Sequence, residues 1–384
     1  MKSAMRSVFL LSSLTILLAG CDRNVFSEES NELSVKQVSQ IMPARKDKEA
    51  WASDMINISK QFKIPVNAEN MCTIIAIIDQ ESNFNASPAV SGLGQTAVKE
   101  IKKQLDEKLG STMGGYFENM LNTKPTPENS YLKQISRVKT EQELDMVYRE
   151  MFDYYTKTYK VNLLTNITKL VGQDIAENFN PVSTLGSMQV HIDYAKAHKR
   201  NMMNVNQLRD DLYTRNGGLY YGIHRLMLYQ AKYDKPLYRF ADYNSGIYSS
   251  RNASFQQMLS QLTGVKLDLD GDLLLYDKDG DALLQKSTTE DVLINYFSQD
   301  ANAPNAIAIR RDLKTEKTQD FESTATYQYV RLKYEAKFKK NAPYAIMPQV
   351  AITGPKVSRD LKTNWYAENV NKRYTTCMSR AKRL

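Results

Sequence analysis

The clearest candidate for chemistry is Glu81, which ends an apolar run. Residues 74–78 read Ile-Ile-Ala-Ile-Ile, and Asp79, Gln80 and Glu81 follow directly. A helix over this run would place Glu81 at its C-terminal end, where burial and the helix dipole both disfavour an ionised carboxylate. A carboxyl that stays protonated near neutral pH can protonate a glycosidic oxygen. The alternative is an ordinary solvated helix end, so the assignment needs support from other segments.

Three later segments supply that support. Residues 183–190 read Ser-Thr-Leu-Gly-Ser-Met-Gln-Val, residues 214–226 contain Asn-Gly-Gly-Leu-Tyr-Tyr-Gly, and residues 240–246 read Phe-Ala-Asp-Tyr-Asn-Ser-Gly. With Glu-Ser-Asn-Phe at 81–84, their order resembles the Slt-type lytic transglycosylases, relatives of goose-type lysozyme. That family carries Glu-Ser-x-Phe, Gly-x-Met-Gln, Asn-x-x-x-Gly-x-x-Tyr-Leu and Ala-x-Tyr-Asn-x-Gly. The resemblance spans residues 70–262.

The resemblance implies a role for each matching position. Glu81 would be the catalytic acid and base of a peptidoglycan lytic transglycosylase. The residues expected to bind substrate or shape the cleft around it are Ser82, Met188, Gln189, Tyr243 and Asn244. The substrate would be the glycan strands of peptidoglycan, and no cofactor or metal would take part.

A single acid suffices for this chemistry. The C6 hydroxyl of N-acetylmuramic acid attacks within the same molecule and closes a 1,6-anhydro ring, so no second carboxylate has to hold a water. A lysozyme-type hydrolase would instead need a second acid. Asp79 is unsuitable, because side chains two positions apart on a helix do not face each other. Asp193 and Asp242 remain candidates for that second acid.

The spacing departs from the family pattern. Gln189 lies 108 residues beyond Glu81, whereas about twenty separate the two motifs in typical members. We therefore expect an insertion over about 87–180. The nearer Gly-Leu-Gly-Gln at 92–95 is a less suitable match, because the later block is preceded by Ser183 and followed by a predicted helix that contains Ala195. The insertion could form a wall of the cleft or block it, and a blocked cleft would leave a non-catalytic peptidoglycan-binding or scaffolding protein.

The N-terminus indicates export and lipidation. Residues 1–20 carry Lys2 and Arg6, then an apolar stretch too short to span a bilayer comfortably. Leu-Leu-Ala-Gly before Cys21 resembles the lipobox of bacterial lipoproteins, which implies a lipid anchor on Cys21 facing the periplasm of a Gram-negative envelope. Asp22 resembles an inner-membrane retention signal of enterobacteria, and the choice between inner and outer membrane stays open. The polar residues up to 44 are predicted to be a tether, so that 21–44 precede the fold.

The two remaining cysteines, Cys72 and Cys377, then become a candidate disulfide in an oxidising compartment. The alternative is two separate buried thiols. The stretches at 217–222 and 238–246 also resemble a family of bacterial lipoproteins of unknown function.

The pattern along the chain predicts a mainly α-helical protein. Helical spacing is found over 46–62, 71–78, 96–109, 141–160 and 211–232. A loop is expected over 110–130, rich in Gly, Asn, Thr and Pro, and a small hairpin after Val265 at the Asp-Gly pairs. We therefore expect a lysozyme-like helical domain over 45–262, interrupted by a helical insertion. A mixed α/β extension over 263–384 is expected to pack on it.

Composition excludes several other classes. The chain has 384 residues, 42% of them apolar, with a net charge of +8 that falls to +6 without Lys2 and Arg6. The sequence has no cluster of basic residues of the kind that indicates nucleic-acid binding. Gly92-x-Gly94-x-x-Ala97 lacks the strand of a dinucleotide fingerprint. The spacing of Asp268, Asp270 and Asp272 does not match an EF-hand, and His191, His198 and His224 show no metal-binding spacing.

Overall fold

A computed structural model describes residues 32–158, 180–277, 280–352 and 361–384. The predicted export signal, Cys21 and the first part of the predicted tether lie outside the described residues. The prediction of a mainly α-helical protein is confirmed, because strand pairing between named strands is confined to two pairs of two-residue strands in the described part of the chain. None of the described helices is long and apolar enough to cross a membrane.

The first helix begins inside the predicted tether. Helix α1 (Val35–Ile41) starts with a capping box in which Ser34 and Gln37 satisfy each other's backbone amides. Val38 and Ile41 are fully buried in the main core. Residues 33–44 are therefore not tether but part of the fold, because their apolar side chains have a core to enter.

Helices α2 (Lys48–Gln61) and α3 (Ala68–Glu81) follow where periodicity predicts them. The Asn67 side chain caps α3 by accepting from the amide of Asn70 at 2.9 Å. Every residue from Met71 to Ile78 is buried, so α3 runs through the interior and brings Glu81 to its far end.

The expected insertion contains three helices in its described part. Helix α4 (Leu93–Thr123) packs against α5 (Tyr131–Arg137), and α5 packs against α6 (Glu141–Thr158). The predicted loop over 110–130 is wrong for residues 111–123, where α4 continues beyond a break at Gly110. Met120 and Leu121 are 7% exposed, and their burial outweighs the weak helix propensity of the nearby glycines.

The next elements return the chain to the main core. Strands β1 (Thr184–Leu185) and β2 (Val190–His191) form an antiparallel pair, with Leu185 opposite Val190. The helices that follow are α9 (Ile192–Ala197), α10 (Val205–Leu212), α11 (Arg215–Met227) and α12 (Pro236–Ser245). The predicted single helix over 211–232 is thus shorter, because Thr214 caps a new helix at Arg215.

A second core gathers around α13 (Ser249–Thr263). Phe255, Met258, Leu259 and Leu262 of α13 pack with apolar side chains between Leu267 and Tyr334. The helices of this core are α14 (Thr288–Phe297), α15 (Ala306–Leu313), the 3-10 helix η1 (Gln319–Ser323) and α16 (Ala325–Phe338). Among the described residues, the expected hairpin is short: an antiparallel bridge joins Tyr276 to Ala282, and Leu283 N donates to Leu275 O at 2.8 Å beside it.

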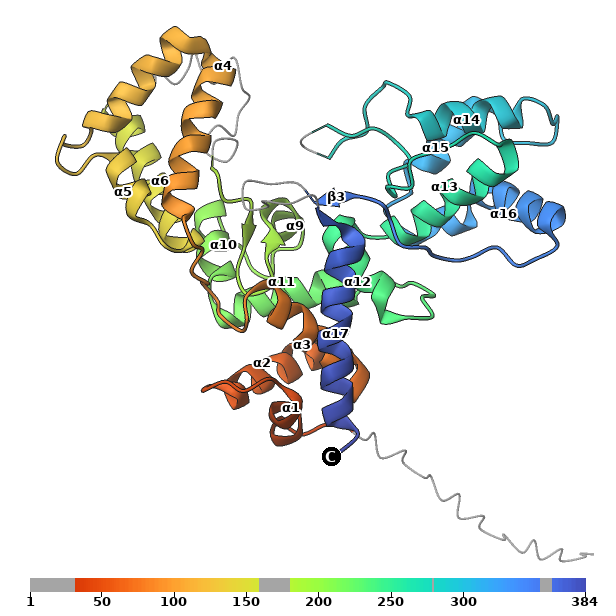
Figure 1. The fold of residues 1–384 in the computed structure, drawn as a ribbon, viewed down its shortest axis with the longest axis horizontal. Coiled ribbons are helices and arrows are strands. Elements are labelled where there is room, and N and C mark those ends of the chain that lie inside the picture. The colour runs from red at the N-terminus through yellow and green to blue at the C-terminus, as the bar shows by residue number, and fades with distance from the viewer. Residues whose placement is uncertain (1–31, 159–179, 278–279, 353–360) are drawn as a thin grey trace, which may run out of the picture. The chain divides into compact units, whose positions relative to one another are not determined.

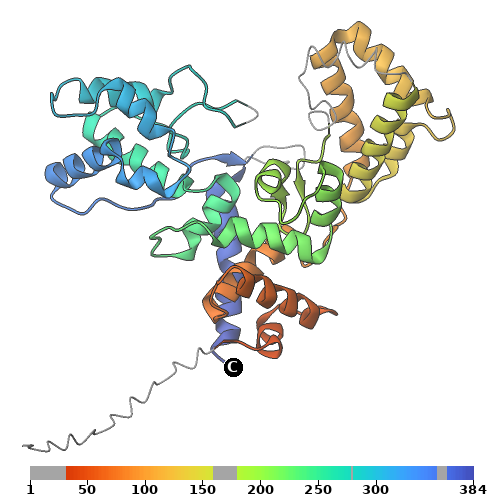
Figure 2. The same cartoon turned by 180° about the vertical axis from the view of Figure 1, so that it is seen from behind.

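The predicted extension over 263–384 is divided between the two cores. Strands β3 (Ala351–Ile352) and β4 (Leu361–Lys362) pair briefly, and α17 (Thr363–Ala381) then runs beside α3 and α12 (Figures 1 and 2). Tyr366, Ala367 and Val370 of α17 belong to the main core. The C-terminal helix is therefore an integral part of the unit that holds Glu81.

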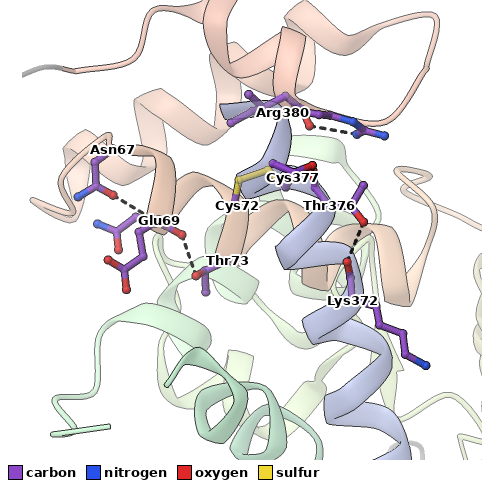
Figure 3. The surroundings of a disulfide bond; sticks show 11 residues. Asn67, Glu69, Cys72, Thr73, Lys372, Thr376, Cys377 and Arg380 are labelled. Atoms are coloured by element: carbon purple, nitrogen blue, oxygen red, sulfur yellow. Dashed lines mark hydrogen bonds between the residues drawn. A yellow bond between two sulfur atoms is a disulfide. The ribbon is translucent and has the colours of Figure 1, made fainter. Parts of the chain in front are cut away.

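A disulfide joins α3 to α17. The Cα atoms of Cys72 and Cys377 are 5.5 Å apart, and the bond closes a sequence separation of 305 residues. Figure 3 shows the two cysteines between the helices, with Arg380 further along α17. Arg380 donates to the backbone oxygen of Ile41 at 3.2 Å, which ties the same end of α17 to α1.

Candidate active site

Glu81 opens onto a cleft of about 760 Å³. The insertion forms one wall of this cleft through α4 and α6, and α17 contributes at another side. The residues from outside the insertion that line it are Glu81, Pro181, Val182, Ser183, Thr184, Gln189, His191, Arg225, Tyr243, Asn244 and Tyr366. Those from the insertion include Leu93, Thr96, Glu100, Gln104, Glu141 and Leu144.

A tight turn directly after Glu81 fixes the end of α3. Asn83 and Phe84 both adopt left-handed backbone conformations, with φ of 55° and 59°. Such a conformation is unusual for Phe, and here the Phe84 ring is held edge-on to Trp51 with centroids 5.4 Å apart. Ser82 is buried in this turn, where its hydroxyl donates to Ile78 O and accepts from the amide of Asn85. Ser82 therefore shapes the turn and does not line the cleft.

The Glu81 carboxyl has a hydrogen-bond donor in α17. The Tyr366 hydroxyl donates to Glu81 Oε1. Burial raises the pKa of Tyr366 well above its ordinary value, and the nearby Glu81 carboxylate raises it further. The phenol consequently stays protonated and remains a donor over the whole physiological pH range.

Tyr243 lies beside this pair on α12. Its hydroxyl donates to the backbone oxygen of Met188 at 2.7 Å, and the Arg225 guanidinium lies 4.6 Å from the centre of its ring. Burial raises the pKa of Tyr243, while Arg225 acts in the opposite direction. Met188 itself is fully buried beneath the cleft, so it supports Tyr243 and is not a lining residue.

The turn between β1 and β2 presents Gln189 to the cleft. Gly186 has φ of 77°, and a Cβ there would lie 2.3 Å from Leu212 O, so the turn requires glycine. The Gln189 amide donates to Glu141 Oε2 at 3.0 Å, and its oxygen accepts from Thr184 at 3.1 Å. Glu141 begins α6 and is 6% exposed, so the insertion holds the Gln189 side chain in place.

Asn244 follows Tyr243 and also lines the cleft. Its amide donates to Thr363 Oγ1 at 3.2 Å, at the start of α17. The structure therefore brings together Glu81, Gln189, Tyr243 and Asn244 from segments far apart in the sequence.

Neither proposed second acid reaches the cleft lining. Asp242 is fully buried on the other side of α12, where it accepts from Tyr248 N at 3.1 Å and Ser250 N at 2.8 Å. Burial raises the pKa of Asp242, and the hydrogen bonds from Tyr233 and Ser250 partly oppose that effect. Asp193 is exposed in the first turn of α9 and pairs with Lys196 at 3.1 Å.

Three residues that contact the predicted site residues were not predicted from the sequence. Glu141 and Arg225 stand at ordinary helical positions, and Tyr366 lies 285 residues beyond Glu81. No local motif marks any of them, so only the packing of α6, α11 and α17 reveals their place. In the described part of the chain, no group of three or more His, Cys, Asp or Glu side chains is arranged to hold a metal ion.

Comparisons with known proteins find one relative of similar length and one family model that matches most of the chain. The chain is 33% identical to the uncharacterized protein YaiW of Escherichia coli strain K12 over 379 residues, which cover 96% of this chain and 98% of that protein. No solved structure matches the chain. The model of a family described as protein of unknown function, DUF1615, matches residues 44–380. With nearly the whole folded part of the chain matched in both comparisons, this protein belongs to the DUF1615 family.

Proposed function

We propose that this protein is a membrane-anchored lytic transglycosylase that cleaves the MurNAc–GlcNAc bond of peptidoglycan with a 1,6-anhydro product. The observation that carries the proposal is the convergence of Glu81, Gln189, Tyr243 and Asn244 on one cleft. These are four of the positions that match transglycosylase motifs, and no local property of the sequence requires them to meet.

The reaction uses Glu81 twice. The Glu81 carboxyl gives its proton to the glycosidic oxygen, and the bond from that oxygen to C1 of N-acetylmuramic acid breaks. The Glu81 carboxylate then takes the proton of the C6 hydroxyl, whose oxygen bonds to C1 and closes the anhydro ring. The acid is restored without a water, which is the advantage of an internal nucleophile.

A product assay tests this function. Residues 22–384 are incubated with purified murein sacculi, and released fragments are identified by mass spectrometry. We expect anhydro-muropeptides from the wild type, at least a hundredfold fewer from Glu81→Gln, and unchanged release from Glu69→Gln, as loss of a general acid costs about 10²–10⁴-fold. Glu69 is a matched control because it is an exposed residue in the first turn of the same helix. Undiminished release by Glu81→Gln would refute the proposal.

A second candidate is hydrolysis, favoured by the presence of Glu141 in the cleft. Hydrolytic glycosidases hold a water with a second carboxylate. The same assay separates the two reactions, because hydrolysis yields reducing ends without the anhydro ring. Binding of sacculi without any release would instead indicate a peptidoglycan-binding or scaffolding role.

The envelope location is a separate part of the proposal, and it depends on lipidation of Cys21. The supporting features are the lipobox-like sequence before Cys21 and the start of the fold only twelve residues later at Leu33. We expect the full-length protein to fractionate with membranes and Cys21→Ala to be lost from them. Recovery of the variant in membranes at the wild-type level would contradict the anchor, and would leave the activity proposal untouched.

A further inference from the structure

Helices α3 and α17 are connected near both ends. The Cys72–Cys377 disulfide joins the start of α3 to the end of α17, and the Glu81–Tyr366 hydrogen bond joins the end of α3 to the start of α17. The two helices therefore run antiparallel. At 1.5 Å per residue, the two connections are about 14 Å apart along α3 and about 16 Å apart along α17.

An ion pair strengthens the contact between these connections. Asp79 Oδ2 of α3 forms an ion pair with Arg373 Nε of α17 at 3.1 Å, and Asp79 Oδ1 accepts from Arg45 at 3.1 Å. Val370 and Ala367 of α17 are fully buried between the two ends. The position of Tyr366 relative to Glu81 is thus determined by a packed and covalently closed helix pair.

Tyr366 is well placed to orient the Glu81 carboxyl. It is 6% exposed, and its hydroxyl donates to Oε1. A donor that stays protonated and is buried in the helix interface holds the Glu81 carboxyl in one orientation toward the cleft.

We propose that Tyr366 is a positioning residue for Glu81, supplied by the C-terminal helix and kept in place by the Cys72–Cys377 disulfide, that fixes the orientation of the Glu81 carboxyl. This inference rests on the proposed function of Glu81. It assigns to α17, which lies outside the segment that resembles transglycosylases, a direct part in the acid site.

Other charged and titratable groups face the same cleft. They come from the remaining elements around it, and they are Tyr243, Arg225, His191, Glu100 and Glu141. The pH profile of a Tyr366 variant must therefore be compared with that of a control variant in which all of these groups are unchanged.

The test compares Tyr366→Phe with Tyr374→Phe. Tyr374 is on the same helix, half-buried against Phe240 with ring centroids 5.9 Å apart, and does not line the cleft. We expect Tyr366→Phe to lower kcat about ten- to hundredfold with little change in KM, as for the loss of a hydrogen bond to a charged group. We also expect the alkaline limb of its kcat/KM profile to move to higher pH, because the lost bond favours the ionised carboxylate. Tyr374→Phe should match the wild type in both.

Two further measurements separate positioning from folding. Replacing Tyr366 by 3-fluorotyrosine keeps the aromatic ring and makes its hydroxyl a stronger hydrogen-bond donor. The alkaline limb of the kcat/KM profile should therefore move to lower pH. The double variant Cys72→Ser/Cys377→Ser should move the limb in the same direction as Tyr366→Phe, by a smaller amount. A limb that moves in none of these three proteins would overturn the inference.

A readout independent of turnover keeps this inference distinct from the proposed function. The side-chain carboxyl signal of Glu81, assigned by its absence in Glu81→Gln, is titrated by carbon NMR in each protein. Its midpoint should rise in Tyr366→Phe and stay unchanged in Tyr374→Phe. A wild type without anhydro products refutes the transglycosylase, whereas equal midpoints in the two variants refute the role of Tyr366.

Discussion

Glu141 shows how a single residue from the insertion can serve the candidate site. Its carboxylate accepts from the Gln189 amide at 3.0 Å in a nearly buried position. We predict that Glu141→Ala lowers the unfolding free energy by about 1–3 kcal/mol, the contribution of a hydrogen bond to a charged group. Urea denaturation measures this change. Glu150→Ala, at an exposed position of the same helix, should stay within about 0.5 kcal/mol of the wild type, and an equal loss in both variants would contradict the role of Glu141.

Glu316 is a second informative residue, in the other core. Burial raises the pKa of Glu316 to about 8, although Tyr276 and the amide of Leu273 donate to its carboxyl. The folded protein then holds a proton that the unfolded chain releases near pH 4.5. Stability should therefore fall as the pH rises from about 4.5 to about 8.

Calorimetry at pH 5 and pH 8 checks this sign. The drop in Tm between the two values should be smaller in Glu316→Gln than in the wild type, because the glutamine does not titrate. Asp320→Asn, at an exposed position nearby, should keep the wild-type drop. An unchanged drop in Glu316→Gln would show that another group is responsible.

At the scale of elements, α11 packs closely against the β1–β2 turn. A Cβ on Gly222 would lie 2.2 Å from Met188 Sδ and 2.5 Å from Met188 Cβ. We predict that Gly222→Ala destabilises the protein by about 1–3 kcal/mol through overpacking. It should also lower activity, because Met188 O is the acceptor for Tyr243.

Gly115→Ala is the matched control for that change. Gly115 is an exposed helical residue of α4, and a Cβ there meets nothing within 4 Å. The substitution should leave stability unchanged or raise it by up to about 1 kcal/mol, as helix propensity predicts. Thermal denaturation of both variants is followed by circular dichroism. Equal shifts of the two unfolding curves from that of the wild type would contradict the packing argument.

For the whole molecule, the folded unit includes α17 at the C-terminal end of the chain. A chain that stops at Thr263 would retain the transglycosylase-like segment, but it would expose the faces of α3 and α12 that α17 covers. It would also expose Phe255, Met258 and Leu259, which belong to the second core. We predict that this shorter chain does not unfold cooperatively, whereas residues 33–384 do.

Near-UV circular dichroism during heating distinguishes the two outcomes. The shorter chain should lack the aromatic signal of fixed packing, and residues 33–384 should lose theirs in one transition. A cooperative transition in the shorter chain would mean that α17 is an addition to an independent domain.

Local sequence patterns were sufficient where burial follows helical spacing. The spacing of Trp51, Met55 and Ile58 predicts α2, and the apolar run with its Asn cap predicts α3 and the place of Glu81 at its end. The same reasoning failed for residues 111–123 and for the tether. There, Leu121 and Val38 are buried where helices pack together, α4 on α5 and α1 on α2 and α17.

The sequence by itself determined the helical class of this protein, its family, and the identity of Glu81, Gln189, Tyr243 and Asn244 as candidates. Each of these depends on periodicity or on a short motif, which are local properties. Only the tertiary structure decided that Ser82 and Met188 support the site from beneath, and that Glu141 and Tyr366 complete it. Contacts between residues 48 or 285 positions apart depend on how helices pack, and no local pattern encodes that packing.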